Sequence, residues 1–313
     1  MIVTRNYANH HKIEKKSIDK TNFLKNKIWV DCINPTKEEI KQIITKTGVS
    51  KADIEDCLDQ SEKSRLQRDQ KYFFFIISVP VRRGDKNTIK TSPLGIFLGK
   101  RFILTVHKLK IKALDDFLKN EENLAPIFKQ GQERIVYNIA LSILKDYHEV
   151  LEDMDQELEK IEGRILKTES EKIPYTILDL KKTLLYIRRA LVGNRDTINS
   201  LKESTLIKKR DLLYDLYIEF VQQVDMVELS RERMTAMLEI YFSLASNKLN
   251  VIMKYFAVIA ALILLPTLIS GIYGMNFISL PLKEHPNGFW MILSIMVLIM
   301  GIMFLYFRRK KWI

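Results

Sequence analysis

The chain has 313 residues, of which 47% are hydrophobic and 28% charged, and its formal net charge is +12 at pH 7. This length allows one or two domains plus a membrane segment. Residues 251–313 carry +5 of that charge, and Glu284 is their single acidic residue. Because so much of the basic excess flanks apolar runs, it indicates a membrane boundary and argues against a nucleic-acid partner.

Residues 1–131 are predicted to form an α/β domain. Thr36 is expected to cap a helix whose first turn holds Glu38 and Glu39. A second short helix is expected to include Ile54–Leu58. The expected strands are rich in β-branched and aromatic residues. They are Ile2–Asn6, Trp29–Ile33, Tyr72–Val81, Leu94–Leu98 and Phe102–His107, with Gly99-Lys100 as the turn between the last two.

The same region offers no catalytic chemistry. It contains no glycine-rich phosphate loop, no Ser/His/Asp set and no paired ligands at metal spacing, so neither an enzyme nor an organic cofactor is expected. His107 is expected to lie in the core or at a sheet edge. Cys32 and Cys57 are expected to be ordinary reduced thiols, which suits a cytoplasmic location.

Residues 132–250 are predicted to form a helical region. Two helices are expected over Ile135–Leu166 and Ile177–Glu203, with Pro174 breaking the chain between them. A third begins near Lys208 and has no breaker before Pro266. Along it apolar residues recur about every 3.5 residues, the period of a seam for neighbouring helices. They are Leu213, Tyr217, Phe220, Val224, Val227, Met234, Leu238, Tyr241, Ala245 and Leu249.

Residues 251–313 are predicted to form a membrane hairpin. Tyr255–Tyr273 and Gly288–Phe307 lack charge and are long enough to span the ~30 Å hydrocarbon layer. We expect a first span over about 253–275, an external loop over 277–287, a second span over 288–307 and a basic tail at 308–313. The positive-inside rule places that tail, Lys254 and both termini in the cytoplasm.

Two spans cannot enclose a conduit, so transport would require an oligomer that contributes one span per subunit. One face of the first span has the small residues that let helices approach closely. It comprises Asn250, Met253, Ala257, Ala260, Leu264, Thr267, Gly271 and Gly274.

The first span closes with Tyr273-Gly274-Met275-Asn276, followed by a short loop, a last apolar helix and a basic tail ending in Lys-Lys-Trp-Ile. In this context the chain resembles the CorA family of magnesium transporters. The order of Trp29, Asp31 and Asn34-Pro35, then Ile54-Glu55-Asp56-Cys57, then Leu104–His107 also resembles the cytoplasmic domain of that family.

The resemblance implies a homopentameric, funnel-shaped channel in the cytoplasmic membrane. Its cytoplasmic α/β domain would be followed by a long helical stalk and two C-terminal transmembrane helices. It also implies a selectivity filter at Gly274, Met275 and Asn276. The expected pore-lining residues are Asn250, Met253, Phe256, Ala260, Leu264, Thr267 and Gly271, of which Met253, Leu264 and Phe256 would form apolar constrictions. Mg²⁺ would be both the transported and the regulatory ion.

In the family, cytosolic magnesium bound between subunits closes the channel, and the matching positions here are Asp215 and, more loosely, Asp85. The external loop departs from the family, because Pro281 is followed by Leu282 and Lys283, with Glu284 only later. A ring of carboxylates at the mouth is therefore absent or moved to Glu284.

Simpler interpretations remain open. Gly274-Met275-Asn276 would also serve as a helix C-cap, and Thr267 would also bond back to its own helix. Asp215 and Asp85 would also fit a solvated helix face and a solvated turn. For function, cobalt and nickel are further candidate ions. The alternatives are a zinc-transporting relative, against which Met275 argues, and a non-conducting membrane-anchored sensor or scaffold.

Overall fold

The computed structural model of the chain describes residues 2–7, 13–16, 27–83, 88–119, 121–165, 172–204, 210–276 and 280–312. The chain forms two compact units, Met1–Met237 and Leu238–Ile313. The first is an α/β unit, and the second contains the two apolar C-terminal segments. The boundary falls inside one long helix, α7 (Arg210–Tyr273).

A mixed seven-stranded sheet is the centre of the first unit, with the order β2-β1-β3-β7-β6-β5-β4. Among the strand pairs of the described residues, β3–β7 is parallel and the other five are antiparallel. The strands are β1 (Ile2–Tyr7), β2 (Ile13–Lys16), β3 (Lys27–Ile33), β4 (Arg65–Arg68), β5 (Tyr72–Arg83), β6 (Thr88–Gly99) and β7 (Phe102–His107).

All five predicted strands are present, and the two that were not predicted, β2 and β4, lie at the edges of the sheet. Their sequences, IEKK and RLQR, are short and charged, as is common for edge strands that must not pair with other chains. The predicted strand Leu94–Leu98 is too short, because β6 begins at Thr88. The polar first half of β6 also pairs with β5, as far as Thr88 opposite Arg83.

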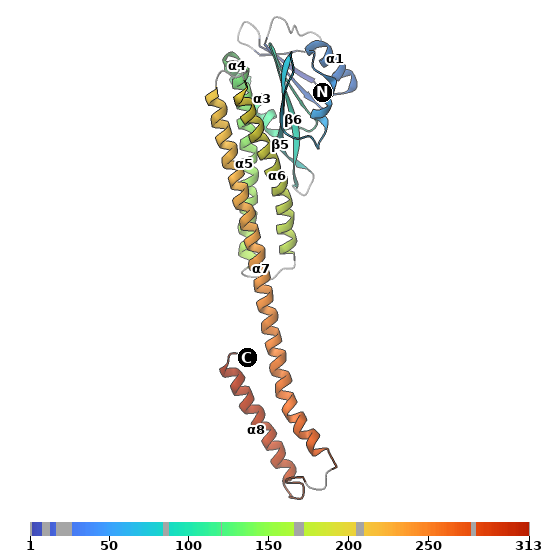
Figure 1. Cartoon of the computed structure of the whole chain (residues 1–313), viewed down its shortest axis with the longest axis vertical. Coiled ribbons are helices and arrows are strands. Elements are labelled where there is room, and N and C mark those ends of the chain that lie inside the picture. The colour runs from blue at the N-terminus through green and yellow to red at the C-terminus, as the bar shows by residue number, and fades with distance from the viewer. Residues whose placement is uncertain are drawn as a thin grey trace. The chain divides into compact units, whose positions relative to one another are not determined.

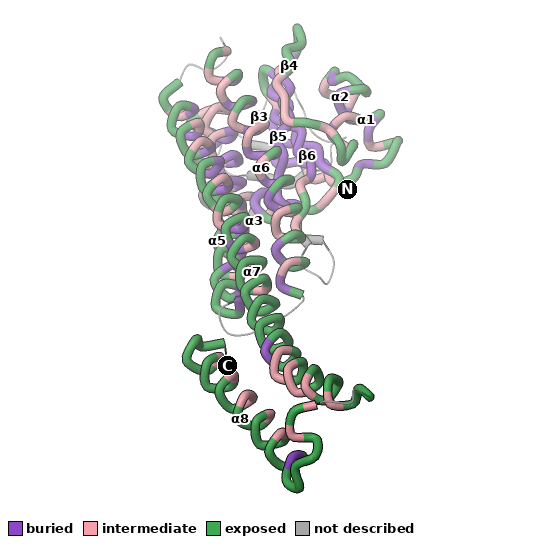
Figure 2. The backbone as a smooth tube through the Cα atoms, turned by 60° about the horizontal axis from the view of Figure 1, so that its bottom comes forward, coloured by how far each residue is buried: buried purple, intermediate pink, exposed green. Residues whose placement is uncertain are grey.

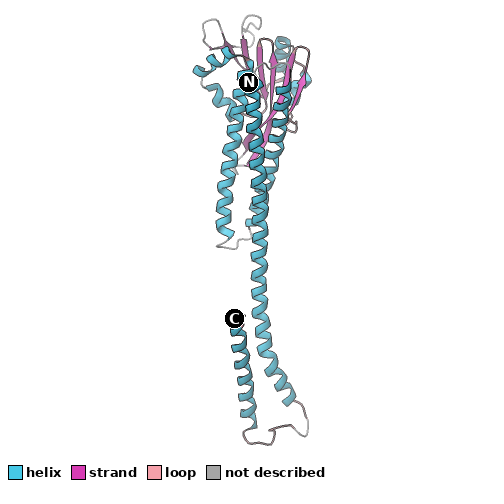
Figure 3. Ribbon diagram, turned by 60° about the vertical axis from the view of Figure 1, so that its left-hand side comes forward, coloured by secondary structure: helices cyan, strands magenta, loops and turns pink. Residues whose placement is uncertain are grey.

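Helices cover both faces of the sheet (Figures 1 and 3). On one face, α1 (Lys37–Thr47) and α2 (Lys51–Leu58) bury apolar residues against alternate residues of the strands. This core includes Ile43, Ile54, Phe74 and Phe97. Thr36 caps α1 as predicted, because its hydroxyl accepts from the Glu39 amide while the Glu39 carboxylate accepts from the Thr36 amide.

The other face is covered by α3 (Lys112–Lys119), α4 (Glu121–Gln130), α5 (Gln132–Ile165) and α6 (Ile173–Glu203). Helices α3 and α4 were not predicted, and both contact the indole of Trp29, through Phe117 and Phe128. The position predicted for Pro174 is wrong. It lies in the first turn of α6 instead of before the helix, because a proline there removes no helical hydrogen bond.

The first part of α7 belongs to this helical layer. The predicted seam residues Leu213, Phe220, Val224, Val227 and Met234 are buried. Ion pairs join the same stretch to its neighbours: Arg233 binds Asp155 and Glu162 of α5, and Glu228 binds Arg188 of α6.

The second unit contains the rest of α7 and α8 (Gly288–Arg309). Both helices are long and apolar enough to cross a membrane, and only 6% of the most apolar stretch of each is buried within the chain. Figure 2 shows this exposure along both helices. A core helix of a water-soluble domain would be mostly buried, so the surrounding apolar medium must be lipid or other chains.

Candidate functional site: the exposed face and C-terminal end of α7

The apolar part of α7 has two contrasting sides. Val258 is buried, and the half-buried positions recur at helical spacing with it: Ala261, Leu262, Leu265, Pro266, Ile269 and Tyr273. These positions lie on one side of α7. The helix α8 runs beside this part of α7 (Figures 1 and 3). At 100° per residue, the predicted pore-lining positions from Met253 to Gly271 lie on the other side of the helix, whereas Asn250 lies about 20° from Ala261.

Each predicted pore-lining residue is exposed in the single chain: Asn250, Met253, Phe256, Ala260, Leu264, Thr267 and Gly271. The exposed fractions of Met253, Phe256 and Leu264 are 66%, 65% and 67%. About two thirds of each of these large apolar side chains is therefore left uncovered by the described part of the chain. The small residues Ala260 and Gly271 lie among them on the same face. At these two positions the backbone of another helix can approach α7 closely.

The Thr267 hydroxyl was expected either to line the pore or to bond back to its own helix, and its geometry is compatible with both. Its Oγ1 donates a hydrogen bond of 2.8 Å to the Ile263 carbonyl oxygen of the same helix. Because the proton points back along the helix, the oxygen keeps lone pairs that can accept hydrogen bonds on the exposed side. A residue in this state can accept from the water shell of a cation.

The helix α7 ends at the predicted filter. The Gly274 amide donates to the Ser270 carbonyl at 2.9 Å, and the Met275 amide donates to the Ile272 carbonyl at 3.2 Å. These bonds close the last turn, and Asn276 follows in non-helical, exposed backbone. A helix cap and a polar ring at a pore mouth are therefore compatible assignments for this segment.

The connector is fastened to the helix on either side of it. The Tyr273 hydroxyl donates to the Pro281 carbonyl oxygen at 3.1 Å. At the start of α8, a Cβ added to Gly288 would lie 2.0 Å from the Leu282 carbonyl oxygen, so only glycine allows this close approach. Glu284 is exposed. The sequence did not predict this bond of the Tyr273 hydroxyl. Its acceptor is a backbone oxygen, which every residue has, so the acceptor cannot be recognised from its residue type.

The two predicted sensor carboxylates are not brought together within the described part of the chain. Asp215 is exposed on α7 and makes no hydrogen bond or ion pair with any described residue. Asp85 lies outside the described residues. Among those that are described, no group of three or more His, Cys, Asp or Glu side chains is placed to hold a metal ion.

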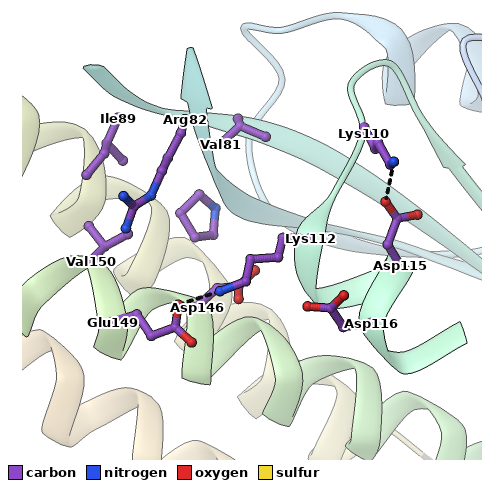
Figure 4. A pocket seen from close by; sticks show the side chains of 11 residues that line it. Val81, Arg82, Ile89, Lys110, Lys112, Asp115, Asp116, Asp146, Glu149 and Val150 are labelled. Atoms are coloured by element: carbon purple, nitrogen blue, oxygen red, sulfur yellow. Dashed lines mark hydrogen bonds and ion pairs between the residues drawn. The ribbon is translucent and has the colours of Figure 1, made fainter. Parts of the chain in front are cut away.

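Figure 4 shows a cavity of the first unit with a volume of about 410 Å³, whose lining includes Asp115, Asp116, Asp146 and Glu149. Its carboxylates are largely matched by local partners. Lys112 pairs with Glu149 at 2.5 Å and Lys110 with Asp115 at 3.4 Å. Burial raises the pKa of Asp146, although its carboxylate accepts from the Ala113 amide at 3.0 Å. The balance of charge gives this cavity little excess attraction for a divalent cation.

Comparisons with known proteins agree with this arrangement. The family model of the CorA-like Mg²⁺ transporter protein matches residues 25–309. The chain therefore belongs to the CorA family of membrane transporters, whose transported substrate is Mg²⁺.

Individual relatives extend the match to the whole chain. It is 35% identical over 292 residues to the cobalt/magnesium transport protein CorA of Methanocaldococcus jannaschii, covering 91% of each chain. It is 26% identical to the protein of the same name from Thermotoga maritima, covering 91% of this chain and 83% of the relative. The complete structure of the M. jannaschii magnesium transporter superposes with a TM-score of 0.91 at 33% identity, covering 100% of this chain and 99% of that one.

Proposed function

We propose that this chain conducts magnesium through a homopentamer whose pore is lined by one copy of α7 per subunit. The observation that carries the proposal is the face containing Met253, Leu264 and Thr267, which is exposed while the opposite side of the helix is half-buried and is fully buried at Val258. Lipid alone could cover an apolar face. It would not favour the polar side chain of Thr267, which lies on the same face.

The stretch of α7 just before the span supports assembly as well. Beyond Met237 the apolar side chains of α7 become more exposed: the exposed fraction of Leu249, the last seam residue, is 63%, and that of the nearby Phe242 is 59%. An apolar seam of this kind is stabilised when equivalent helices pack around a common axis. Because α7 is a single helix from Arg210 to Tyr273, movement of its first part would be transmitted to the span.

The ion path follows from the chemistry of Mg²⁺, which gives up its water reluctantly and prefers oxygen ligands. A ring of Asn276 amides at the mouth, with backbone carbonyls near Gly274 and Met275, would contact the hydrated ion without binding it too tightly to release. Thr267 would offer a second ring of oxygens. Met253, Phe256 and Leu264 would form apolar constrictions that close the path by excluding water.

The orientation proposed is cytoplasmic for both termini, because Lys254 and Arg308 to Lys311 flank the spans on one side. A negative membrane potential would then drive passive influx. Cobalt is a second candidate ion, since two relatives bear the name cobalt/magnesium transport protein. Nickel is a further candidate on the same oxygen chemistry.

We further propose that cytosolic magnesium closes the channel by binding Asp215 together with a carboxylate of a neighbouring subunit, with Asp85 as its partner. An exposed carboxylate that has no hydrogen-bond or ion-pair partner among the described residues is consistent with an intersubunit ligand. If saturating magnesium on the cytoplasmic side closes wild type and Asp215→Ala equally, Asp215 is not the sensor.

The decisive experiment measures magnesium entry into liposomes that contain the purified protein, a magnesium-sensitive dye and a negative-inside potential. We expect entry in wild type and its loss in Asn276→Ala. Asn287→Ala is the matched control, because that exposed asparagine directly precedes α8 and its side chain makes no capping bond. The subunit number is measured by mass in parallel. An intact pentamer without entry of magnesium, cobalt or zinc would favour the sensor or scaffold function instead.

A further inference from the structure

A cavity of about 650 Å³ lies in the first unit, between the loop before β4, the first half of β6 and one side of α6. This volume is within the range of ligand sites, roughly 300–1,000 Å³. All of its described lining residues lie between Gln60 and Gly193, so it belongs wholly to the α/β unit and does not depend on the assignment of the pore.

The lining has an excess of positive charge. Lys63, Lys90 and Arg189 come from the loop, from β6 and from α6 respectively, and none of them has a hydrogen-bond or ion-pair partner among the described residues. Among the described lining residues the one carboxylate is Glu62, and it binds the Arg65 guanidinium at 2.8 Å. Three cations that converge on one cavity without counter-charges favour a ligand with several negative charges.

An exposed aromatic ring stands next to these cations. Tyr186 is 53% exposed and precedes Arg189 by three residues on α6, so the two side chains share one side of the helix. The phenol ring is therefore available to stack with a planar group of a ligand whose charged part reaches Arg189. Ser61 and Thr91 in the same lining offer hydroxyl groups for further hydrogen bonds.

The buried side of the cavity is held in one conformation by hydrogen bonds among Ser64, Ser78 and Asn194. The side-chain oxygen of Asn194, which is fully buried, accepts from the Ser64 hydroxyl at 2.8 Å and from the Ser78 amide at 2.8 Å. Gly193 permits the contact, because a Cβ there would lie 3.1 Å from the Ser64 Cβ. The loop that carries Lys63 is thus held in place before any ligand arrives, which lowers the entropic cost of binding.

We propose that this cavity binds a nucleoside di- or triphosphate, with the phosphates against Lys63, Lys90 and Arg189 and the base stacked on Tyr186. Lysine and arginine side chains bind phosphate oxygens through charge-assisted hydrogen bonds. An aromatic ring supplies a sequence-tolerant platform for a base. We infer binding without a reaction, since the described lining residues include neither a glycine-rich phosphate loop nor a metal-holding cluster.

The test is isothermal titration calorimetry of the full-length protein in detergent, without divalent cations, using ATP, inorganic tripolyphosphate and adenosine as separate probes. ATP is expected to bind more tightly than either fragment. Each of Lys63→Gln, Lys90→Gln and Arg189→Gln should raise the Kd for ATP about fivefold, and the triple variant should abolish measurable binding. Tyr186→Ala should weaken ATP binding and leave tripolyphosphate binding unchanged.

The matched control is the triple variant Lys41→Gln, Lys129→Gln, Lys182→Gln, which removes the same charge from exposed lysines that do not line the cavity. It should keep the wild-type Kd. Absence of ATP binding to wild type, or an equal loss in the two triple variants, would overturn the proposal. Equal affinities for tripolyphosphate and ATP, with no effect of Tyr186→Ala, would also overturn it, in favour of a site for inorganic anions.

Discussion

The Tyr273 hydroxyl and the Pro281 carbonyl oxygen lie 3.1 Å apart, and the bond between them joins the last residue of α7 to the connector. The segment Gly274-Met275-Asn276 follows Tyr273 directly, so it begins at a point that this bond holds. A filter made of one asparagine per subunit depends on how accurately each amide is placed. The bond therefore gives Tyr273 a positioning role at the proposed pore mouth.

Replacing Tyr273 with phenylalanine should lower magnesium uptake about fivefold while keeping the ring and the oligomer. The physical reason is the loss of one hydrogen bond worth about 1 kcal/mol, which loosens the connector against the helix end. Uptake in dye-loaded liposomes gives the measurement. Tyr255→Phe is the control, because that residue is also half exposed and has no hydrogen-bond partner among the described residues. Equal uptake in both variants would remove Tyr273 from this role.

Thr267→Val should lower magnesium uptake about tenfold, whereas Thr267→Ser should keep most of it. Valine has the shape of threonine but removes the oxygen that would accept from the water shell of the ion. Ser294→Ala on α8 is a close control, because the Ser294 hydroxyl also bonds back along its own helix, to the Trp290 carbonyl at 2.8 Å. If Ser294→Ala reduced uptake as much as Thr267→Val, helix packing would explain the loss and pore lining would not.

Asn194→Ala should lower the free energy of unfolding of the α/β unit by about 2–4 kcal/mol. The fully buried amide accepts from the Ser78 amide and the Ser64 hydroxyl and donates to the Ser78 carbonyl at 2.7 Å, so truncation removes three buried hydrogen bonds at once. The Ser78 amide and carbonyl keep only their second bonds, to Ser64 Oγ at 3.2 Å and from the Tyr147 hydroxyl at 2.9 Å. Thermal or denaturant unfolding of the full chain in detergent measures the change. Asn199→Ala on the same helix removes only an exposed bond to Glu203 and should cost less than about 0.5 kcal/mol.

The sequence predicted the elements whose residue pattern is local. The spans, the long helices and the five central strands each repeat one pattern over many residues, and all are present. The exposed side of α7 was predictable for the same reason, since helical spacing alone groups Met253, Leu264 and Thr267 on one face. Its use as a pore is still a proposal, because spacing cannot say what covers a face.

What the sequence did not predict depends on contacts between distant residues. Asn194 is an ordinary polar residue in its helix, and its burial follows from Ser78, which is 116 residues away. The bond from Tyr273 ends on a backbone oxygen, which every residue possesses. The helices α3 and α4 are short, and their contacts with Trp29 also link distant parts of the chain.

His107 makes the stability of the α/β unit depend on pH. Its side chain is 1% exposed, with Nε2 3.2 Å from an Asp31 carboxylate oxygen and Nδ1 2.6 Å from the Leu109 carbonyl. Burial lowers the pKa of the imidazole, but the hydrogen bond and charge of Asp31, with the Leu109 bond, outweigh it and leave the pKa raised. The protonated imidazole of His107 is therefore more favoured in the native state than in the unfolded state.

The sign of the effect follows from linkage. With a raised native pKa, the stabilisation is complete below the unfolded value of about 6.5 and is lost as the pH rises through the native pKa. The melting temperature of wild type should therefore fall between pH 5.5 and 8.5 by more than that of His107→Gln. His148→Gln should keep the wild-type slope, because its side chain is 50% exposed and lies 3.9 Å from Glu152. Equal slopes for wild type and His107→Gln would show that the Asp31–His107 pair does not respond to pH.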